Sequence, residues 1–219
     1  MDPAAVATAL GRLRDRIAGA GGDPEAVRVV AVTKGFGADA IEAARATGLT
    51  DIGENYADEL ARKFALVQGA GATWHFLGAV QRNKVARLAP LVDCWQSVAR
   101  LEEGARIARH RLGARVLVQV SVSAAPGRNG VAPASVPALV GGLSDLGLSV
   151  GGLMTVAPPD PDGARAAFET LARLADDLGL PERSMGMTDD LEAAVRAGST
   201  MVRVGRALFG PRPPERSGG

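Results

Sequence analysis

One lysine follows directly on an apolar segment near the start of the chain. Residues 28–36 read RVVAVTKGF, so Lys34 comes after a run of apolar residues and before a turn that contains Gly35. An ammonium group that is partly removed from water has a lowered pKa, and the free amine can then attack an aldehyde. Only three of the 25 Lys and Arg residues are lysine, so each lysine is a candidate for chemistry that arginine cannot perform. The alternative is a surface lysine that extends to water from the end of a strand.

Two short motifs near the other end of the sequence are rich in glycine and hydroxyl-bearing residues. SMGMT covers residues 184–188, and RVGR covers residues 203–206. The backbone N–H groups of a glycine turn, together with a Ser or Thr hydroxyl, can bind a phosphate group. An amine facing such a turn would suit an aldehyde that carries a phosphate. The simpler interpretation is that Gly186 and Gly205 only permit tight turns.

Short apolar segments alternate with helical patterns between these motifs. Eight strand-like segments are each followed by a helical one, and apolar residues at helical spacing over 6–17 indicate a further helix before them. Strands joined by single helices form a parallel sheet, and eight such units close a barrel. We therefore predict a single-domain (β/α)8 TIM barrel over residues 1–210 with an additional N-terminal helix, followed by a disordered tail over 211–219. An open, doubly wound sheet is the alternative.

The predicted barrel would gather the candidate residues at one end. Functional side chains of this fold lie at the carboxyl ends of the strands. The residues expected there are Lys34, Asn55, Met154, Ser184, Thr188, Arg203 and Gly205. The amine and the glycine motifs would then face the same mouth of the barrel. The other two lysines are expected elsewhere, Lys63 in the solvated segment DELARKF and Lys84 at the surface.

Composition narrows the classes of partner. The formal net charge is +1, which favours neither nucleic acid nor an anionic membrane surface. Cys94 is the only cysteine, so no internal disulfide is possible, and charged residues interrupt every apolar run before the ~20 residues that span a bilayer. These features favour a soluble, cytoplasmic protein with no nucleic-acid or membrane partner, and we expect a monomer.

Six motifs together resemble the YggS/PROSC family of pyridoxal 5′-phosphate (PLP) homeostasis proteins. They are VAVTKGF, DIGENYADEL, WHFLGAVQRNK, GGLMTVAP, SMGMTDDLEAAVRAGSTMVRVG and ALFG, in this order along the chain. The resemblance implies a barrel like the N-terminal domain of bacterial alanine racemase, with PLP held as an internal aldimine on Lys34. It also implies contacts to the cofactor ring from Asn55 and Met154, contacts to its phosphate from Ser184, Thr188 and Gly205, and an arginine, Arg203, facing the pyridine nitrogen.

The chain departs from the family pattern at three places. The turn after Lys34 reads GFGAD where a turn that contains proline is usual, which leaves the lysine itself unaffected. Arg206 stands where the last motif usually has threonine, and Ala79 stands where a histidine is usual. The change at Arg206 removes a hydroxyl from the expected phosphate site, but the guanidinium is expected to approach the phosphate from the start of the following helix.

The resemblance implies a carrier more than an enzyme. A racemase needs a base on each face of the substrate, and in alanine racemase the second base is a tyrosine of another domain. Tyr56 is the only tyrosine here and is expected at the start of a helix. We therefore expect a protein that buffers PLP and delivers it to PLP-dependent apo-enzymes. A weak PLP-dependent racemase or aldolase and a structural barrel without cofactor are the alternatives.

Overall fold

Eight parallel strands form a closed barrel in the computed structural model, which describes residues 1–69, 71–122 and 129–212. Each strand pairs with the next along the chain, and the last pairs with the first. The strands are β1 Arg28–Val32, β2 Asp51–Glu54, β3 Thr73–Phe76, β4 Cys94–Val98, β5 Arg115–Gln119, β6 Ser149–Met154, β7 Glu182–Ser184 and β8 Met201–Val204. The predicted barrel is confirmed, and the open sheet is excluded.

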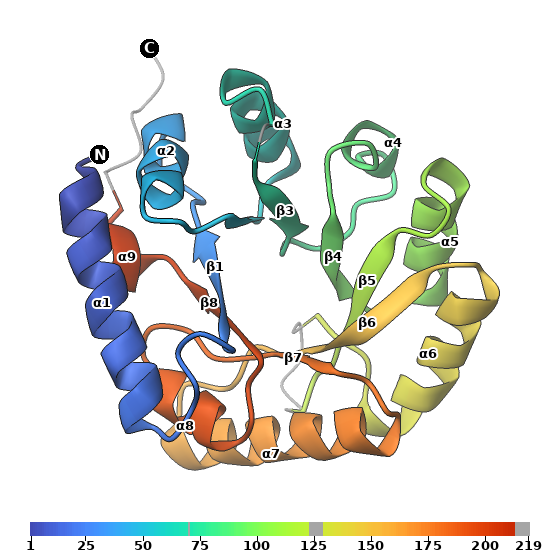
Figure 1. The fold of residues 1–219 in the computed structure, drawn as a ribbon. Coiled ribbons are helices and arrows are strands. Elements are labelled where there is room, and N and C mark those ends of the chain that lie inside the picture. Colours follow the sequence, from blue (N-terminus) through green and yellow to red (C-terminus); the bar gives the residue numbers. More distant parts are fainter. Residues whose placement is uncertain (70, 123–128, 213–219) are drawn as a thin grey trace.

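Helices surround the barrel on its outer side (Figure 1). They are α1 Pro3–Gly19, α2 Ala38–Ala46, α3 Ala57–Leu66, α4 Val85–Leu88, α5 Leu101–His110, α6 Val136–Asp145, α7 Pro161–Asp177, α8 Leu191–Arg196 and α9 Arg206–Phe209, with a short 3-10 turn, η1 Pro133–Ser135, before α6. No helix in the described part of the chain is long and apolar enough to cross a membrane. Most of the tail expected at 211–219 lies outside the described residues.

Helix α1 completes the outer layer where the last helix is short. Helix α9 has only four residues, and α1 packs against it and against α2 and α8 (Figure 1). The apolar face of α1 is buried through Val6, Leu10, Leu13 and Ile17, as their helical spacing predicted. The Asp2 side chain caps the helix by accepting a hydrogen bond from the Ala4 N–H. The additional N-terminal helix is therefore confirmed as part of the barrel wall.

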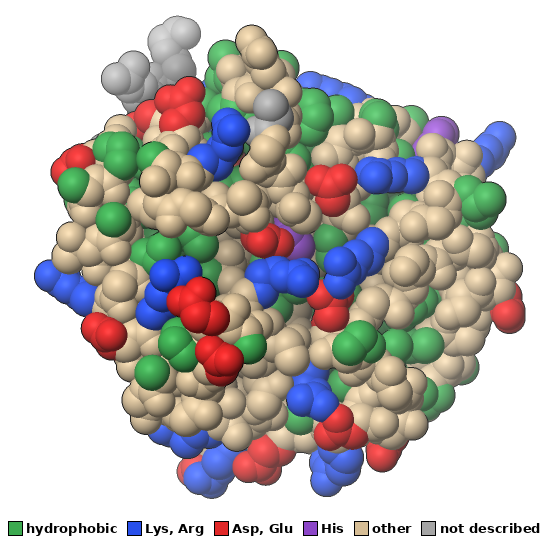
Figure 2. All heavy atoms as spheres, viewed as in Figure 1, with side chains coloured by type: hydrophobic (Ala, Val, Ile, Leu, Met, Phe, Trp, Pro, Cys, Tyr) green, Lys and Arg blue, Asp and Glu red, His purple; other side chains and the backbone are tan. Residues whose placement is uncertain are grey.

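Ion pairs close the amino-terminal end of the barrel. Arg28, Asp51, Arg115 and Glu182 are each the first residue of their strand. Arg28 lies 3.1 Å from Glu182 and 3.9 Å from Asp51, and Arg115 also pairs with Glu182. Figure 2 shows acidic and basic side chains intermixed over one face of the molecule, in keeping with the small net charge. The strands therefore start among paired charges, and the candidate site lies at their opposite ends.

Candidate functional site

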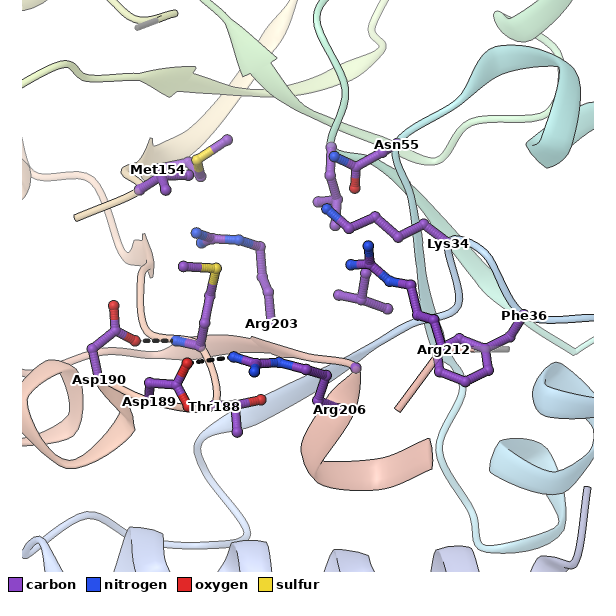
Figure 3. Close-up of a pocket in the computed structure, with 15 residues that line it drawn as sticks. Lys34, Phe36, Asn55, Met154, Thr188, Asp189, Asp190, Arg203, Arg206 and Arg212 are labelled. Carbon is purple, nitrogen blue, oxygen red and sulfur yellow. Dashed lines mark hydrogen bonds and ion pairs between the residues drawn. The ribbon is translucent and has the colours of Figure 1, made fainter. Parts of the chain in front are cut away.

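A cavity of about 250 Å³ opens at the carboxyl ends of the strands. All the sequence-predicted site residues except Ser184 line it: Lys34, Asn55, Met154, Thr188, Arg203, Gly205 and Arg206. Figure 3 shows the Lys34 amine pointing into this space, with Asn55 and Arg212 beside it and Met154 and Arg203 across from it. The fold thus brings together residues that follow β1 and β2, residues of β6 and β8, the start of α9 and the loop after β7.

The Lys34 amine is half-buried, and its surroundings favour the neutral form. Burial is the main cause that lowers its pKa, and the positive charges of Arg212 and Arg203 lower it further. Glu54 and Glu59 act in the opposite direction with smaller effect. A larger fraction of the amine is therefore unprotonated near neutral pH than in a fully exposed lysine, and only the unprotonated form is a nucleophile.

Arg203 is a buried cation whose partners are all uncharged. Its guanidinium donates to the carbonyl oxygens of Ser184 at 2.6 Å and Thr155 at 2.7 Å, and to the Ser184 hydroxyl at 2.9 Å. Among the described residues no carboxylate forms an ion pair with it. Burial lowers the pKa of Arg203 to about 10, so the group still carries its positive charge at neutral pH. It presents this charge to the cavity without a neutralising anion.

A line of hydrogen bonds through the barrel interior supports Arg203. The Ser184 hydroxyl donates to the Gln96 side-chain oxygen at 2.6 Å, and the Gln96 amide nitrogen lies 2.7 Å from His75 Nδ1. His75 Nε2 lies 2.8 Å from Asp51. Because an amide nitrogen can only donate, His75 Nδ1 accepts, and the ring hydrogen on Nε2 is donated to Asp51. Arg203, Ser184, Gln96 and His75 therefore all donate toward Asp51, which only accepts.

The loop after β7 is tied at several points. The Met187 N–H donates to Asp190 at 2.5 Å, and Arg16 of α1 donates to the Thr188 carbonyl at 2.8 Å while it pairs with Glu192 at 2.6 Å. Gly186 has φ +95, a conformation that favours glycine, and an added Cβ would lie 2.6 Å from the Ala194 side chain. These contacts fix the loop that forms the lower wall of the cavity in Figure 3.

Comparison with known proteins gives this arrangement a family. A family model described as "Alanine racemase, N-terminal domain" matches residues 2–213. The "Pyridoxal phosphate homeostasis protein" of Pseudomonas aeruginosa is 40% identical over 216 residues, which cover 94% of each chain. The chain belongs to the pyridoxal phosphate homeostasis family. The resemblance inferred from the six motifs is confirmed.

Solved structures of a family relative have the same fold. PipY of Synechococcus elongatus without PLP is 32% identical and superposes with a TM-score of 0.85, covering 94% of this chain and all of PipY. PipY with PLP bound is 31% identical, with a TM-score of 0.77 over 90% of this chain and all of PipY. The names of these family members describe homeostasis or the cofactor, and none names a reaction.

Ser184 differs from the other family-motif residues in its position. Its side chain is fully buried and is not among the residues that line the cavity. The hydroxyl is engaged by Gln96 and Arg203, as described above. The resemblance implied a contact to phosphate, which stays a prediction. In the structure the hydroxyl accepts a hydrogen bond from Arg203 and donates one to Gln96.

Two arginines near the cavity differ in their surroundings. Arg206, which replaces the usual threonine of the family, is largely exposed and pairs with Asp189 (Figure 3). Arg212 lines the cavity and lies 3.1 Å from the Cβ position of Gly35. Sequence analysis missed Arg212 because it placed the residue in the tail. A cation directly after the last helix of a barrel was the only available signal.

The expectation of a solvated Lys63 is wrong. The side chain is fully buried between α3 and the barrel, and its amine lies 2.6 Å from Glu54 and 2.8 Å from Glu59. A signal was present in the sequence, because Lys63 follows Leu60 by three residues and so shares its inward face of the helix. Lys84, by contrast, is partly exposed and pairs with Asp58 at 2.9 Å.

Gly78 fixes the position of Asn55 in the cavity wall. An added Cβ at Gly78 would lie only 1.9 Å from the Asn55 carbonyl oxygen. Gly78→Ala is therefore expected to displace the Asn55 backbone and to lower the free energy of unfolding by ~1–3 kcal/mol. Urea unfolding measures this loss. Gly141→Ala is the control, since no atom lies within 4 Å of its Cβ position; equal effects of both substitutions would contradict the assignment.

Proposed function

We propose that this protein binds PLP covalently through Lys34 and acts in PLP homeostasis by holding the cofactor and releasing it to PLP-dependent apo-enzymes. The single observation that carries the proposal is the half-buried Lys34 amine, whose pKa is lowered, pointing into a cavity at the barrel mouth. The bound form of PipY, a relative 31% identical, supports the choice of ligand. A monomeric, cytoplasmic protein is part of the proposal.

The residues of the cavity fit this cofactor. It holds one amine with a lowered pKa, an apolar wall that includes Met154, and the cation Arg212, to which a phosphate could bind, while Arg206 is paired with Asp189. When bound, PLP supplies an aldehyde that condenses with an amine and a pyridine ring that can act as an electron sink. The Lys34 amine would provide the nucleophile, and Thr188 would offer a hydroxyl to the phosphate.

Arg203 limits the chemistry available in this cavity. Its charge has no counter-anion among the described residues, and such a cation would disfavour protonation of a pyridine nitrogen bound near it. The electron sink would then be weaker. Arg203 would in this way help to hold the cofactor without activating it.

The lining offers no free base opposite Lys34. Among the described residues, no tyrosine, histidine, cysteine or glutamate lines the cavity, and Asp189 and Asp190 are engaged by Arg206 and by the Met187 N–H. Tyr56 is 62% exposed and lines a separate depression. A racemase needs an acid and a base on opposite faces of its substrate, so this arrangement supports a carrier. Weak racemase or aldolase activity is the second candidate, favoured only by the amine itself.

Reduction with borohydride after loading with PLP tests the proposal. Borohydride makes a covalent link to an amine permanent, and peptide mapping then identifies the labelled lysine. We expect the label on Lys34. Without reduction, we expect the bound PLP to be transferred to an apo-enzyme. A label confined to Lys63 or Lys84 would overturn the assignment, and turnover of alanine or threonine that is lost in Lys34→Ala would favour the enzyme.

The rate of PLP attachment is expected to depend on pH through Lys34. The rate should rise with pH as the ammonium loses its proton, and it should level off above the pKa of Lys34. The midpoint of this rise should lie below the pKa of a free lysine. Arg212→Ala removes a positive charge that lowers this pKa, so the midpoint should move to higher pH and the rate at neutral pH should fall. Stopped-flow absorbance across neutral and alkaline pH measures the midpoint.

Arg206→Ala is the matched control for this experiment. Arg206 lines the same cavity, but the main charges that shift the pKa of Lys34 are Arg212, Arg203, Glu54 and Glu59. Its removal should leave the midpoint unchanged. An identical shift in both variants would contradict the assignment of this effect to Arg212, because it would show that Arg206 acts on the Lys34 amine equally.

A further inference from the structure

A buried ion cluster lies directly beside the segment that carries Lys34. The Lys63 amine of α3 donates to the Thr33 carbonyl at 2.6 Å and to Glu54 at 2.6 Å, and it lies 2.8 Å from Glu59. The side chains of Lys63 and Glu54 are both 0% exposed. Three oxygens therefore surround an ammonium group that has three N–H donors.

The same cluster holds the chain on both sides of Lys34. On one side, the Thr33 hydroxyl donates to Glu54 at 2.6 Å, and the Thr33 carbonyl accepts from Lys63. On the other side, the Gly35 N–H donates to Glu59 at 2.9 Å. Lys34 is thus the residue between two peptide groups that are fixed by one set of charges.

Stability does not require charges at this place. The space between the barrel and its helices is otherwise filled by apolar side chains such as Ile52 and Leu60. Burying an ion pair costs solvation energy that its attraction often fails to recover, and apolar replacements of similar volume are often as stable. Charged groups do, however, fix geometry, because their hydrogen bonds require specific distances and angles.

We propose that Lys63 is a positioning residue for Lys34: together with Glu54 and Glu59 it fixes the peptide groups on either side, so that the Lys34 amine projects into the cavity in one orientation. This inference rests on the proposed function for its ligand, an aldehyde that carries a phosphate. The geometry itself belongs to the chain without any ligand.

The test compares two lysine variants and two threonine variants. Lys63→Met keeps the length of the side chain and removes its charge, and Lys84→Met is the control at the partly exposed lysine. Thr33→Val replaces the hydroxyl that bonds Glu54 by a methyl group, and Thr33→Ser keeps a hydroxyl at this position.

The rate of PLP attachment to these variants is followed by absorbance over a range of pH. We expect Lys63→Met to attach PLP ~10- to 100-fold more slowly, since a small misplacement of a reacting group can cost this much. Thr33→Val should be slower than Thr33→Ser.

A second readout uses the protein without PLP. An amine-acylating reagent labels Lys34 and Lys84, and mass spectrometry of the peptides gives their relative rates. Lys63→Met should change the rate and pH midpoint of labelling at Lys34 while labelling at Lys84 stays the same. If the reagent labels Lys34 differently in Lys63→Met and in the wild type, but the wild type never attaches PLP, the proposed function fails and the positioning role stands.

Wild-type attachment and labelling rates in Lys63→Met would overturn the inference. If Lys63→Met does not fold, Thr33→Val decides, and rates equal to those of Thr33→Ser and the wild type would overturn it.

Discussion

Lys34→Ala is expected to abolish covalent retention of PLP. The other lysines cannot replace it, because Lys63 is fully buried in its ion cluster and Lys84 does not line the cavity. Borohydride treatment followed by denaturation should leave no cofactor on the variant, whereas the wild type should retain it. We also expect the affinity for PLP to fall by at least ~100-fold, because the covalent bond between the cofactor and a well-positioned amine can no longer form.

Lys84→Ala is the control for this loss. It removes a lysine that is partly exposed and paired with Asp58, and it should leave labelling at wild-type level. Stoichiometric label on Lys34→Ala after denaturation would contradict the assignment of the attachment site.

Glu54→Leu is expected to lower the free energy of unfolding by ~3–5 kcal/mol, because it leaves the buried Lys63 ammonium without one of its two carboxylates. Burial raises the pKa of Glu54 and Lys63 lowers it by a smaller effect, so the carboxylate already has an unfavourable environment. Its second oxygen has no hydrogen-bond partner among the described residues. Urea unfolding of the protein without PLP measures the change.

The double variant Glu54→Leu/Lys63→Met should recover most of this loss. With both charges gone, no uncompensated ammonium remains, and an apolar pair can fill the space. Additive losses in the two single variants and the double variant would show that the residues do not act as a pair. A recovered double variant that still attaches PLP slowly would separate the role of the cluster in positioning from its role in folding.

The barrel was predictable because its signal repeats along the chain. Eight apolar strands with helical patterns between them leave few arrangements, and the carboxyl ends of parallel strands must meet at one mouth. Lys34 and Arg203, far apart in sequence, could therefore be placed in one site before their contacts were known. The functional roles that the resemblance implies for them remain predictions.

Three features were missed in the sequence analysis, each for a physical reason. Lys63 was assigned to solvent because charged residues surround it in sequence, and its partners Glu54 and Thr33 are supplied by the barrel. The contacts of Ser184 follow from the direction of one side chain inside the barrel. Arg212 follows the last regular element, where periodicity gives no information.

The hydrogen bonds from Arg203 to Asp51 have a one-way order. Reversing the amide of Gln96 would set two acceptors against each other at His75 and leave the Ser184 hydroxyl without an acceptor. None of the inner members can therefore turn over alone. These hydrogen bonds connect the ion pairs at the amino-terminal end of the barrel with Arg203 at the carboxyl-terminal end. A substitution of Asp51 should therefore change the position of the Arg203 guanidinium in the cavity.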